Sequence, residues 1–252
     1  MFLDRGAPGI RGTGDGSANP GPPHHGGAAG RASKPGGRRS RETTAAAVWA
    51  AVHTERRALV EDLTDLTDLQ WETPSLCQGW AVRDVVAHLA ATATLTRRGF
   101  IRELASSGLS TQRIVDRQIT RARAHDAAAS LAALHAAAHE VASPPRPVIT
   151  RVVEILVHAE DIRHPLGVHR DYPSSWVIAA LLHLAGDRSS GGRARLAGLT
   201  LAATDTLFIT GAGPLVAGPA AALLLAAGGR AARLQDLSGP GRAVLADRMH
   251  AS

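Results

Sequence analysis

The fold is set by the stretch Pro74-Ser75-Leu76-Cys77-Gln78-Gly79-Trp80-Ala81-Val82-Arg83-Asp84-Val85-Val86-Ala87-His88-Leu89. Pro74 and Gly79 mark a turn, and apolar residues at helical spacing follow from Val82 onward. The pattern therefore predicts a turn that leads directly into a helix, and this helix carries His88.

A second helix, later in the chain, contains the pair Glu154-x-x-x-His158. Residues four apart on a helix lie on the same face with Cβ atoms roughly 5–6 Å apart, so this pair can bind one ion. With His88 on a facing helix, three ligands converge, and three ligands with a fourth position left open are typical of a catalytic zinc site. The alternative is that His88 is a hydrogen-bonded core histidine and that Glu154 and His158 form an ordinary side-chain pair.

The composition favours a helical protein with a substantial core. The chain has 252 residues, of which 44% are apolar and only 3% are aromatic. Abundant Ala and Leu favour helices over strands rich in aromatic and β-branched residues. The single cysteine, Cys77, excludes an intramolecular disulfide and is consistent with a cytoplasmic protein, so we expect it to pack as a small apolar residue.

The positive charge lies mainly in the N-terminal segment. Residues 1–43 contain seven Lys or Arg against three Asp or Glu, whereas the whole chain has a net charge of +6. The remainder is nearly neutral, which disfavours a nucleic-acid partner because phosphate binding needs a basic folded surface. There is no run of about 18 apolar residues and no apolar core of a secretory signal at the N-terminus, so we expect no membrane association.

Three segments are expected from the pattern of helices and breaks. Residues 1–43, rich in Gly and Pro, are predicted to be a disordered tail, and residues 44–189 a helical bundle. The four bundle helices are predicted at about 44–69, 82–93, 111–142 and 147–165, and a further helix at about 173–187. The third helix either runs through or breaks near residues 125–126. Residues 190–252 are predicted to be a small α+β domain, with a hairpin or meander at about 199–210 and helices at about 219–227 and 240–250.

The same residues resemble the mycothiol-dependent maleylpyruvate isomerase family. The resemblance covers about residue 48 to the end and rests on combined motifs: Trp71-x-x-Pro74-Ser75-Leu76-Cys77-x-Gly79-Trp80-x-Val82-Arg83-Asp84-Val85-x-Ala87-His88-Leu89, Val153-Glu154-x-x-x-His158-x-x-Asp161-Ile162-Arg163-x-Pro165-Leu166-Gly167, and Gly211-x-Gly213-Pro214 with Val216-x-Gly218-Pro219-Ala220. It implies a mainly α fold, a DinB-like four-helix bundle followed by a small α+β domain.

The resemblance also implies a function. It implies zinc, or another divalent metal, on His88, Glu154 and His158, and mycothiol as cofactor or cosubstrate. The expected protein is a cytoplasmic monomer or homodimer that uses this small-molecule thiol on a small electrophilic substrate, as an isomerase of the maleylpyruvate type or a thiol S-transferase. The alternative is a non-enzymatic metal-binding protein with a regulatory or ligand-binding role.

Further residues are candidates for supporting roles. Arg117, Arg121 and Arg230 are predicted to bind the substrate, the alternative being solvated surface charges. Asp161 either orients the imidazole of His158 or pairs with Arg163 or Arg83.

The sequence departs from the family pattern at two places, and it contains a second histidine pair that could be mistaken for a metal site. Ala81 replaces a usual Thr or Ser, which removes a helix cap at a cost of about 1 kcal/mol. Leu207-Phe208 stands where the family often has Asp-Trp, and this places the identity of the substrate in question. The pair His135 and His139 is interpreted as surface, because no third ligand accompanies it.

Overall fold

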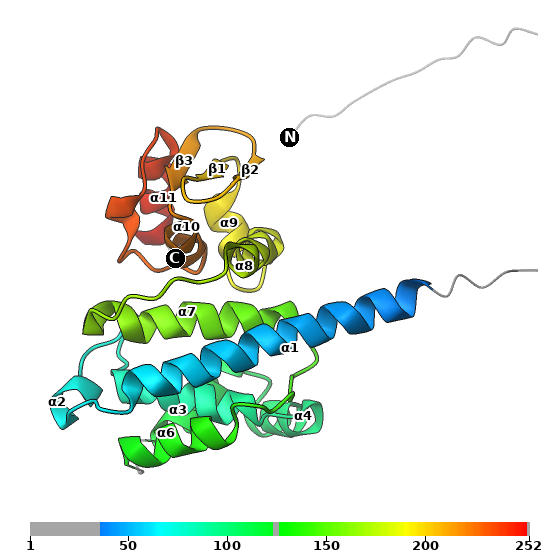
Figure 1. The fold of residues 1–252 in the computed structure, drawn as a ribbon, viewed down its shortest axis with the longest axis vertical. Coiled ribbons are helices and arrows are strands. Elements are labelled where there is room, and N and C mark those ends of the chain that lie inside the picture. The colour runs from blue at the N-terminus through cyan, green and yellow to red at the C-terminus, as the bar shows by residue number, and fades with distance from the viewer. Residues whose placement is uncertain (1–35, 123–125, 251–252) are drawn as a thin grey trace, which may run out of the picture.

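The computed structural model describes residues 36–122 and 126–250, and the predicted mainly α class is confirmed (Figure 1). The helices before the sheet are α1 Gly36–Leu63, α2 Asp68–Trp71, α3 Val82–Ala93, α4 Arg97–Ser106, α5 Thr111–Ala122, α6 Ala127–Ala136, α7 Ile149–Leu166, α8 Ser174–Gly186 and α9 Gly192–Leu196. The remaining elements are β1 Thr200–Ala203, β2 Phe208–Gly211, β3 Leu215–Gly218, α10 Ala220–Ala227, the 3-10 turn η1 Leu234–Asp236 and α11 Gly241–His250.

The four-helix bundle consists of α1, α3, α6 and α7 (Figure 1). Helix α5 packs against α3. The helix predicted at 111–142 is divided into α5 and α6 near the expected break. The carboxylate of Asp126 accepts a hydrogen bond from the backbone N–H of Ala128 at 3.1 Å and so caps α6. The predicted tail lies outside the described residues up to residue 35, and α1 begins at Gly36.

The first bundle helix ends earlier than predicted, and the helices α2, α4 and α9 were not predicted as separate helices. Thr67 caps the short α2 in a capping box with Gln70, so the chain turns after Leu63. Helix α4 buries none of its residues, so its sequence has no apolar periodicity from which the helix could be predicted. At the start of α3, Ala81 offers no side-chain cap, but Asp84 still accepts a hydrogen bond from the backbone N–H of Ala81 at 3.0 Å.

The second layer holds a three-stranded sheet in the order β2-β1-β3. β1 pairs antiparallel with β2, as the predicted hairpin requires, and parallel with β3. Helix α8 packs against both α7 and α10, so one continuous apolar cluster joins the bundle to the C-terminal elements. None of the described helices combines the length and apolar content needed to cross a bilayer.

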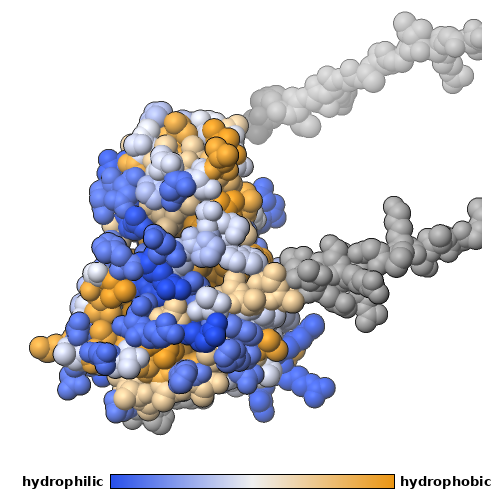
Figure 2. Space-filling view, in the orientation of Figure 1, coloured by the Kyte–Doolittle hydropathy of each residue, from blue (hydrophilic) through white to orange (hydrophobic). Residues whose placement is uncertain are grey.

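The Leu207-Phe208 departure lies at the start of β2. Leu207 is fully exposed and Ile209 is largely exposed, whereas Phe208 packs against the core. Figure 2 shows apolar surface in the part of the molecule where Figure 1 places β2. Leu207 therefore faces solvent, on the outside of the C-terminal layer.

Candidate functional site

The turn before α3 is held by its own hydrogen bonds and by α7. Ser75 donates from its backbone N–H to the carbonyl of Trp80 at 2.9 Å, and its hydroxyl accepts from the N–H of Cys77 at 3.1 Å. Gly79 adopts a φ of 77°, which glycine reaches without steric cost. The N–H of Leu76 donates to the carbonyl of Asp161 at 3.1 Å. The turn is thus fixed against α7, with Cys77 directed at that helix.

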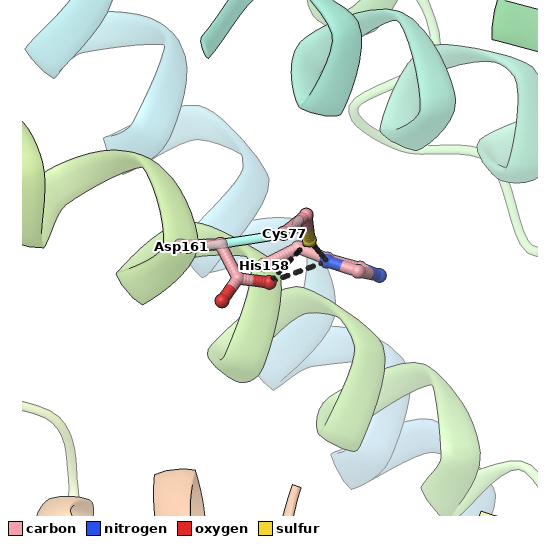
Figure 3. Close-up of side chains that lie close together, drawn as sticks. All are labelled: Cys77, His158 and Asp161. Atoms are coloured by element: carbon pink, nitrogen blue, oxygen red, sulfur yellow. Dashed lines mark hydrogen bonds and ion pairs between the residues drawn. The ribbon is translucent and has the colours of Figure 1, made fainter. Parts of the chain in front are cut away.

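Cys77, His158 and Asp161 lie close together at this junction (Figure 3). The thiol of Cys77 donates to Oδ2 of Asp161 at 3.0 Å, and Nδ1 of His158 lies 2.9 Å from the same oxygen. Since the carboxylate accepts, Nδ1 of His158 carries a proton, and Nε2 is the ring nitrogen that can serve as a ligand atom. Asp161 is fully buried, so its orientation of the imidazole is rigid.

Arg230, which follows α10, completes the environment of Asp161. Its Nε donates to Oδ1 at 2.9 Å and its Nη2 to Oδ2 at 2.8 Å, a bidentate pair. Burial alone would raise the pKa of Asp161, but hydrogen bonds from His158 and Arg230 outweigh it and hold this pKa well below its usual range. Of the roles predicted for Asp161, the structure shows the contact with His158.

The other predicted partners of Asp161 are engaged elsewhere. Arg163 donates to Asp62 at 2.7 Å, and Arg83 pairs with Glu72 at 2.8 Å. Cys77 was predicted only to pack as a small apolar residue. The structure gives it polar contacts as well: its thiol hydrogen-bonds Asp161 and lies 3.5 Å from Nη2 of Arg230.

The donor atoms of Cys77, His158 and Asp161 all lie within 4.8 Å of one another, which would suit a metal ion geometrically. Two features oppose this assignment. The short distances are those of hydrogen bonds already formed, and the guanidinium of Arg230 lies 2.8 Å from Oδ2 of Asp161. A divalent cation between these groups would be repelled by the guanidinium. We therefore interpret this group as the support of His158 and place the ligand face at Nε2.

Cys77 is expected to be unreactive in the folded protein. Burial, and after it the charge of Asp161, raises the pKa of its thiol to about 12. At pH 8, alkylation by iodoacetamide should be slower than in the urea-unfolded chain by about two to three orders of magnitude, because the thiolate is the reacting species. Timed mass spectrometry measures both rates, and equal rates would show that Cys77 is an available nucleophile.

His88 faces His158 from α3. The two ring centroids lie 5.1 Å apart in an edge-to-face arrangement, and the ring of Trp80 also packs edge-to-face against His88 at 5.4 Å. His88 is 7% exposed. Burial, then the charges of His158 and Arg151, lower the pKa of His88 to about 3, so it is neutral at physiological pH and has a lone pair to offer a metal.

Glu154, the third predicted ligand, lies one turn before His158 but pairs with Arg151. Oε2 of Glu154 is 2.8 Å from Nη1 of Arg151. The donor atoms of His88, Glu154 and His158 do not all fall within 4.8 Å of one another, the spacing that Cys77, His158 and Asp161 meet among the described residues. The structure thus brings the two imidazoles together and leaves the carboxylate on a cation. Two imidazoles and a carboxylate remain a donor set that zinc accepts, and the metal assignment stays a prediction.

The three candidate arginines have different positions. Arg230 is at the site, but Asp161 and the carbonyl of Gly228 occupy its guanidinium. Arg117 is exposed and donates to the end of α4, to Ser106 and Ser107. Arg121 belongs to α5, and its side chain lies outside the described part of the chain. Substrate binding by these arginines stays a prediction.

Two site residues were not singled out from the sequence. Arg151 is 6% exposed and lies three residues before Glu154, a spacing that places both on one helix face. Gln118 on α5 borders the same cavity as His88, and no motif marks it. The signal for Arg151 was therefore present in the sequence, whereas that for Gln118 was not. The decoy His139 packs against the ring of His53 at 5.5 Å.

Comparison with known proteins agrees with the architecture. Residues 52–163 match the model of the mycothiol maleylpyruvate isomerase N-terminal domain. Two crystal structures, of the mycothiol-dependent maleylpyruvate isomerase and of its variant with a histidine replaced by alanine, are each 14% identical, with TM-scores of 0.59 and 0.58. Each likeness covers 78% of this chain and 92% of the other. No curated protein matches the chain. The resemblance and the DinB-like fold class are confirmed.

Proposed function

We propose that this chain, which carries a mycothiol maleylpyruvate isomerase N-terminal domain, is a metal-dependent enzyme that uses mycothiol to act on a small electrophilic substrate. The preferred reaction is an isomerisation of the maleylpyruvate type, and transfer of the thiol to an electrophile is the related alternative. The observation that carries the proposal is the arrangement around His158: a buried carboxylate holds Nδ1, and the ring packs edge-to-face against a second, neutral imidazole, that of His88, with the ring centroids 5.1 Å apart.

This arrangement is the one that metal-binding histidines commonly have. A ligating imidazole usually donates its other N–H to a carboxylate, which fixes the ring and increases its basicity. Here Asp161 is that carboxylate, and Arg230 fixes Asp161 through two hydrogen bonds. We assign Arg230 as a positioning residue, which acts on the site through Asp161.

The residues that would hold the metal are His88, Glu154 and His158. A divalent ion such as zinc on these ligands would supply Lewis-acid chemistry and lower the pKa of a thiol bound at its open position. The protein does not contribute the thiol itself, since the pKa of Cys77 is raised to about 12 and its thiol is bonded to Asp161. The nucleophile is therefore assigned to the cosubstrate.

The test uses the purified full chain after incubation with zinc. Conversion of maleylpyruvate to its trans isomer, followed by ultraviolet absorbance, should require added mycothiol, and should cease when the protein is treated with a chelator. Glutathione in place of mycothiol, at the same concentration, controls for a nonspecific thiol effect. A conjugate detected by mass spectrometry with a reactive halide would indicate the transferase alternative. Metal binding without thiol-dependent turnover of either kind would refute the enzyme assignment and favour a ligand-binding protein.

A further inference from the structure

The sheet of the C-terminal layer has one covered edge and one open edge. At β3, Ser238 exchanges two backbone hydrogen bonds with Ala217, at 2.9 and 2.7 Å, and so covers that edge. No described segment pairs with the outer side of β2, the strand at the other end of the order β2-β1-β3. An edge strand offers free N–H and C=O groups to another strand, and natural proteins usually protect such edges with charges, proline or a covering segment.

The hydrogen bonds of β1 show which of its residues bond toward which neighbour. The N–H of Thr200 donates to the carbonyl of Pro214 at 3.0 Å, and that of Thr204 to the carbonyl of Gly218 at 3.0 Å. Both acceptors lie on the β3 side, so the even-numbered residues of β1 bond toward β3. In a strand the next residue bonds to the opposite side, and the odd-numbered residues of β1 therefore bond toward β2.

The same alternation identifies the free backbone groups of β2. The partners of the odd-numbered residues of β1 are Phe208 and Thr210, which bond inward. The N–H and C=O groups of Leu207, Ile209 and Gly211 are therefore directed away from the sheet. The side chains of this outward set are exposed as well, since Leu207 is fully exposed and Ile209 is 72% exposed.

The open edge is apolar and carries no charge. The chain has no Asp, Glu, Lys or Arg from residue 206 to residue 229. The preceding residue, Asp205, accepts a hydrogen bond from the N–H of Ala220 at 3.0 Å and so holds the hairpin to the start of α10. A two-fold dimer brings each group near its own copy, and an uncharged edge meets a second copy of itself without like-charge repulsion.

We propose that β2 pairs antiparallel with β2 of a second copy of this chain, around a two-fold axis at Ile209. In this register Ile209 exchanges two hydrogen bonds with its own copy, and Leu207 lies opposite the partner's Gly211. Gly211 has no side chain, so Leu207 has room beside it, and the two Ile209 side chains pack across the axis. One strand pair is smaller than the roughly 800 Å² per partner of a stable interface, so the dimer is weak, with a dissociation constant on the order of 10–100 µM.

Sedimentation equilibrium of the full chain tests the proposal, at concentrations on the order of 5 to 500 µM, which bracket this constant. The mass should rise from the 26.2 kDa of one chain toward twice that value. Amide hydrogen exchange, followed by mass spectrometry on peptides that contain residues 207–211, should slow over the same concentrations. The reason is that the outward N–H groups of Leu207 and Ile209 become bonded in the dimer.

Two substitutions at the axis separate charge from backbone pairing. Ile209→Lys places a cation against its own copy and should weaken association by about 100-fold or more. Ile209→Pro removes the outward N–H, which costs no hydrogen bond within the sheet, and should weaken association by about 10-fold or more. Leu69→Lys is the matched control, because it adds the same charge at a leucine of α2 that is 85% exposed. Leu215→Lys, on β3, tests the exposed side of the sheet away from the β2 edge.

A monomer at every concentration overturns the proposal and leaves the open edge to an extended segment of another protein. Equal losses of association in Ile209→Lys and Leu69→Lys also overturn it. Loss in Leu215→Lys with an intact dimer in Ile209→Pro would show that the sheets stack face to face, which contradicts edge pairing. Circular dichroism verifies that each variant is folded, and if Ile209→Pro is not, Ile209→Lys and the concentration dependence of amide exchange decide.

Discussion

A His88→Ala, His158→Ala double variant is expected to bind no zinc after dialysis, whereas the wild type should carry about one zinc ion per chain. The two imidazoles face one another at 5.1 Å, and each has a fixed neighbour: His88 packs against the half-buried Trp80, and His158 is hydrogen-bonded to the buried Asp161. Removing both leaves Glu154 as the last predicted ligand, and its carboxylate already has a cation in Arg151. Elemental analysis by mass spectrometry measures the metal content directly.

The chain supplies a matched control in His135 and His139, a second pair four residues apart in the sequence. A His135→Ala, His139→Ala variant removes the same number of imidazoles and should retain the full metal content. Retention of zinc by the His88 and His158 variant would refute the ligand assignment. Loss of zinc in the control alone would move the site to the end of α6.

Replacing Arg163 with methionine should lower the free energy of unfolding by about 3–5 kcal/mol, the cost of removing one partner from a buried ion pair. Arg163 is fully buried on α7. It donates to Asp62 of α1 at 2.7 Å and to the hydroxyl of Tyr172 at 2.8 Å, and Glu55 is 3.6 Å away. The variant would leave Asp62 and Tyr172 without this cation, whereas Glu55 keeps Arg170 at 2.9 Å. Urea denaturation followed by circular dichroism measures the loss.

Arg233→Met is the control, because Arg233 donates to Asp236 at the same 2.7 Å but in a partly exposed position. Solvent screens that pair, so the variant should lose less than about 1 kcal/mol. The comparison separates burial from the mere presence of a pair. Equal losses in the two variants, at unchanged denaturant slope, would show that the network around Arg163 contributes no more than a surface bridge.

Local patterns predicted the elements that carry the site. Apolar periodicity and a preceding turn defined α3 and so located His88, and the same reasoning defined α7 with Glu154 and His158. Helix α4 was not predicted because it buries no residue, and apolar periodicity reveals only helices that bury one face. The break between α5 and α6 was visible because Asp126 is a residue that caps helices.

Contacts between segments that are distant in the chain could not be predicted from the sequence. The cation that pairs with Asp161 was sought in Arg163 and Arg83, which belong to the recognised motifs, but it is Arg230, 69 residues further along the chain and outside those motifs. The polar role of Cys77 escaped for the same reason, since its thiol meets Asp161 across 84 residues. Side-chain periodicity on one helix carries no information on which residue of another element will face it.

The bidentate contact of Arg230 with Asp161 limits how far the two parts of the molecule can be treated as interchangeable modules. All three predicted ligands lie in the bundle, but the cation that fixes the imidazole of His158 is supplied from beyond α10. Exchange of the C-terminal segment for one without an arginine at this position would keep all three predicted ligands. It would remove the hydrogen bonds that fix Asp161 and, through it, the imidazole of His158. If the proposed metal site is correct, the C-terminal layer is therefore constrained at one residue by ligands that it does not itself contain.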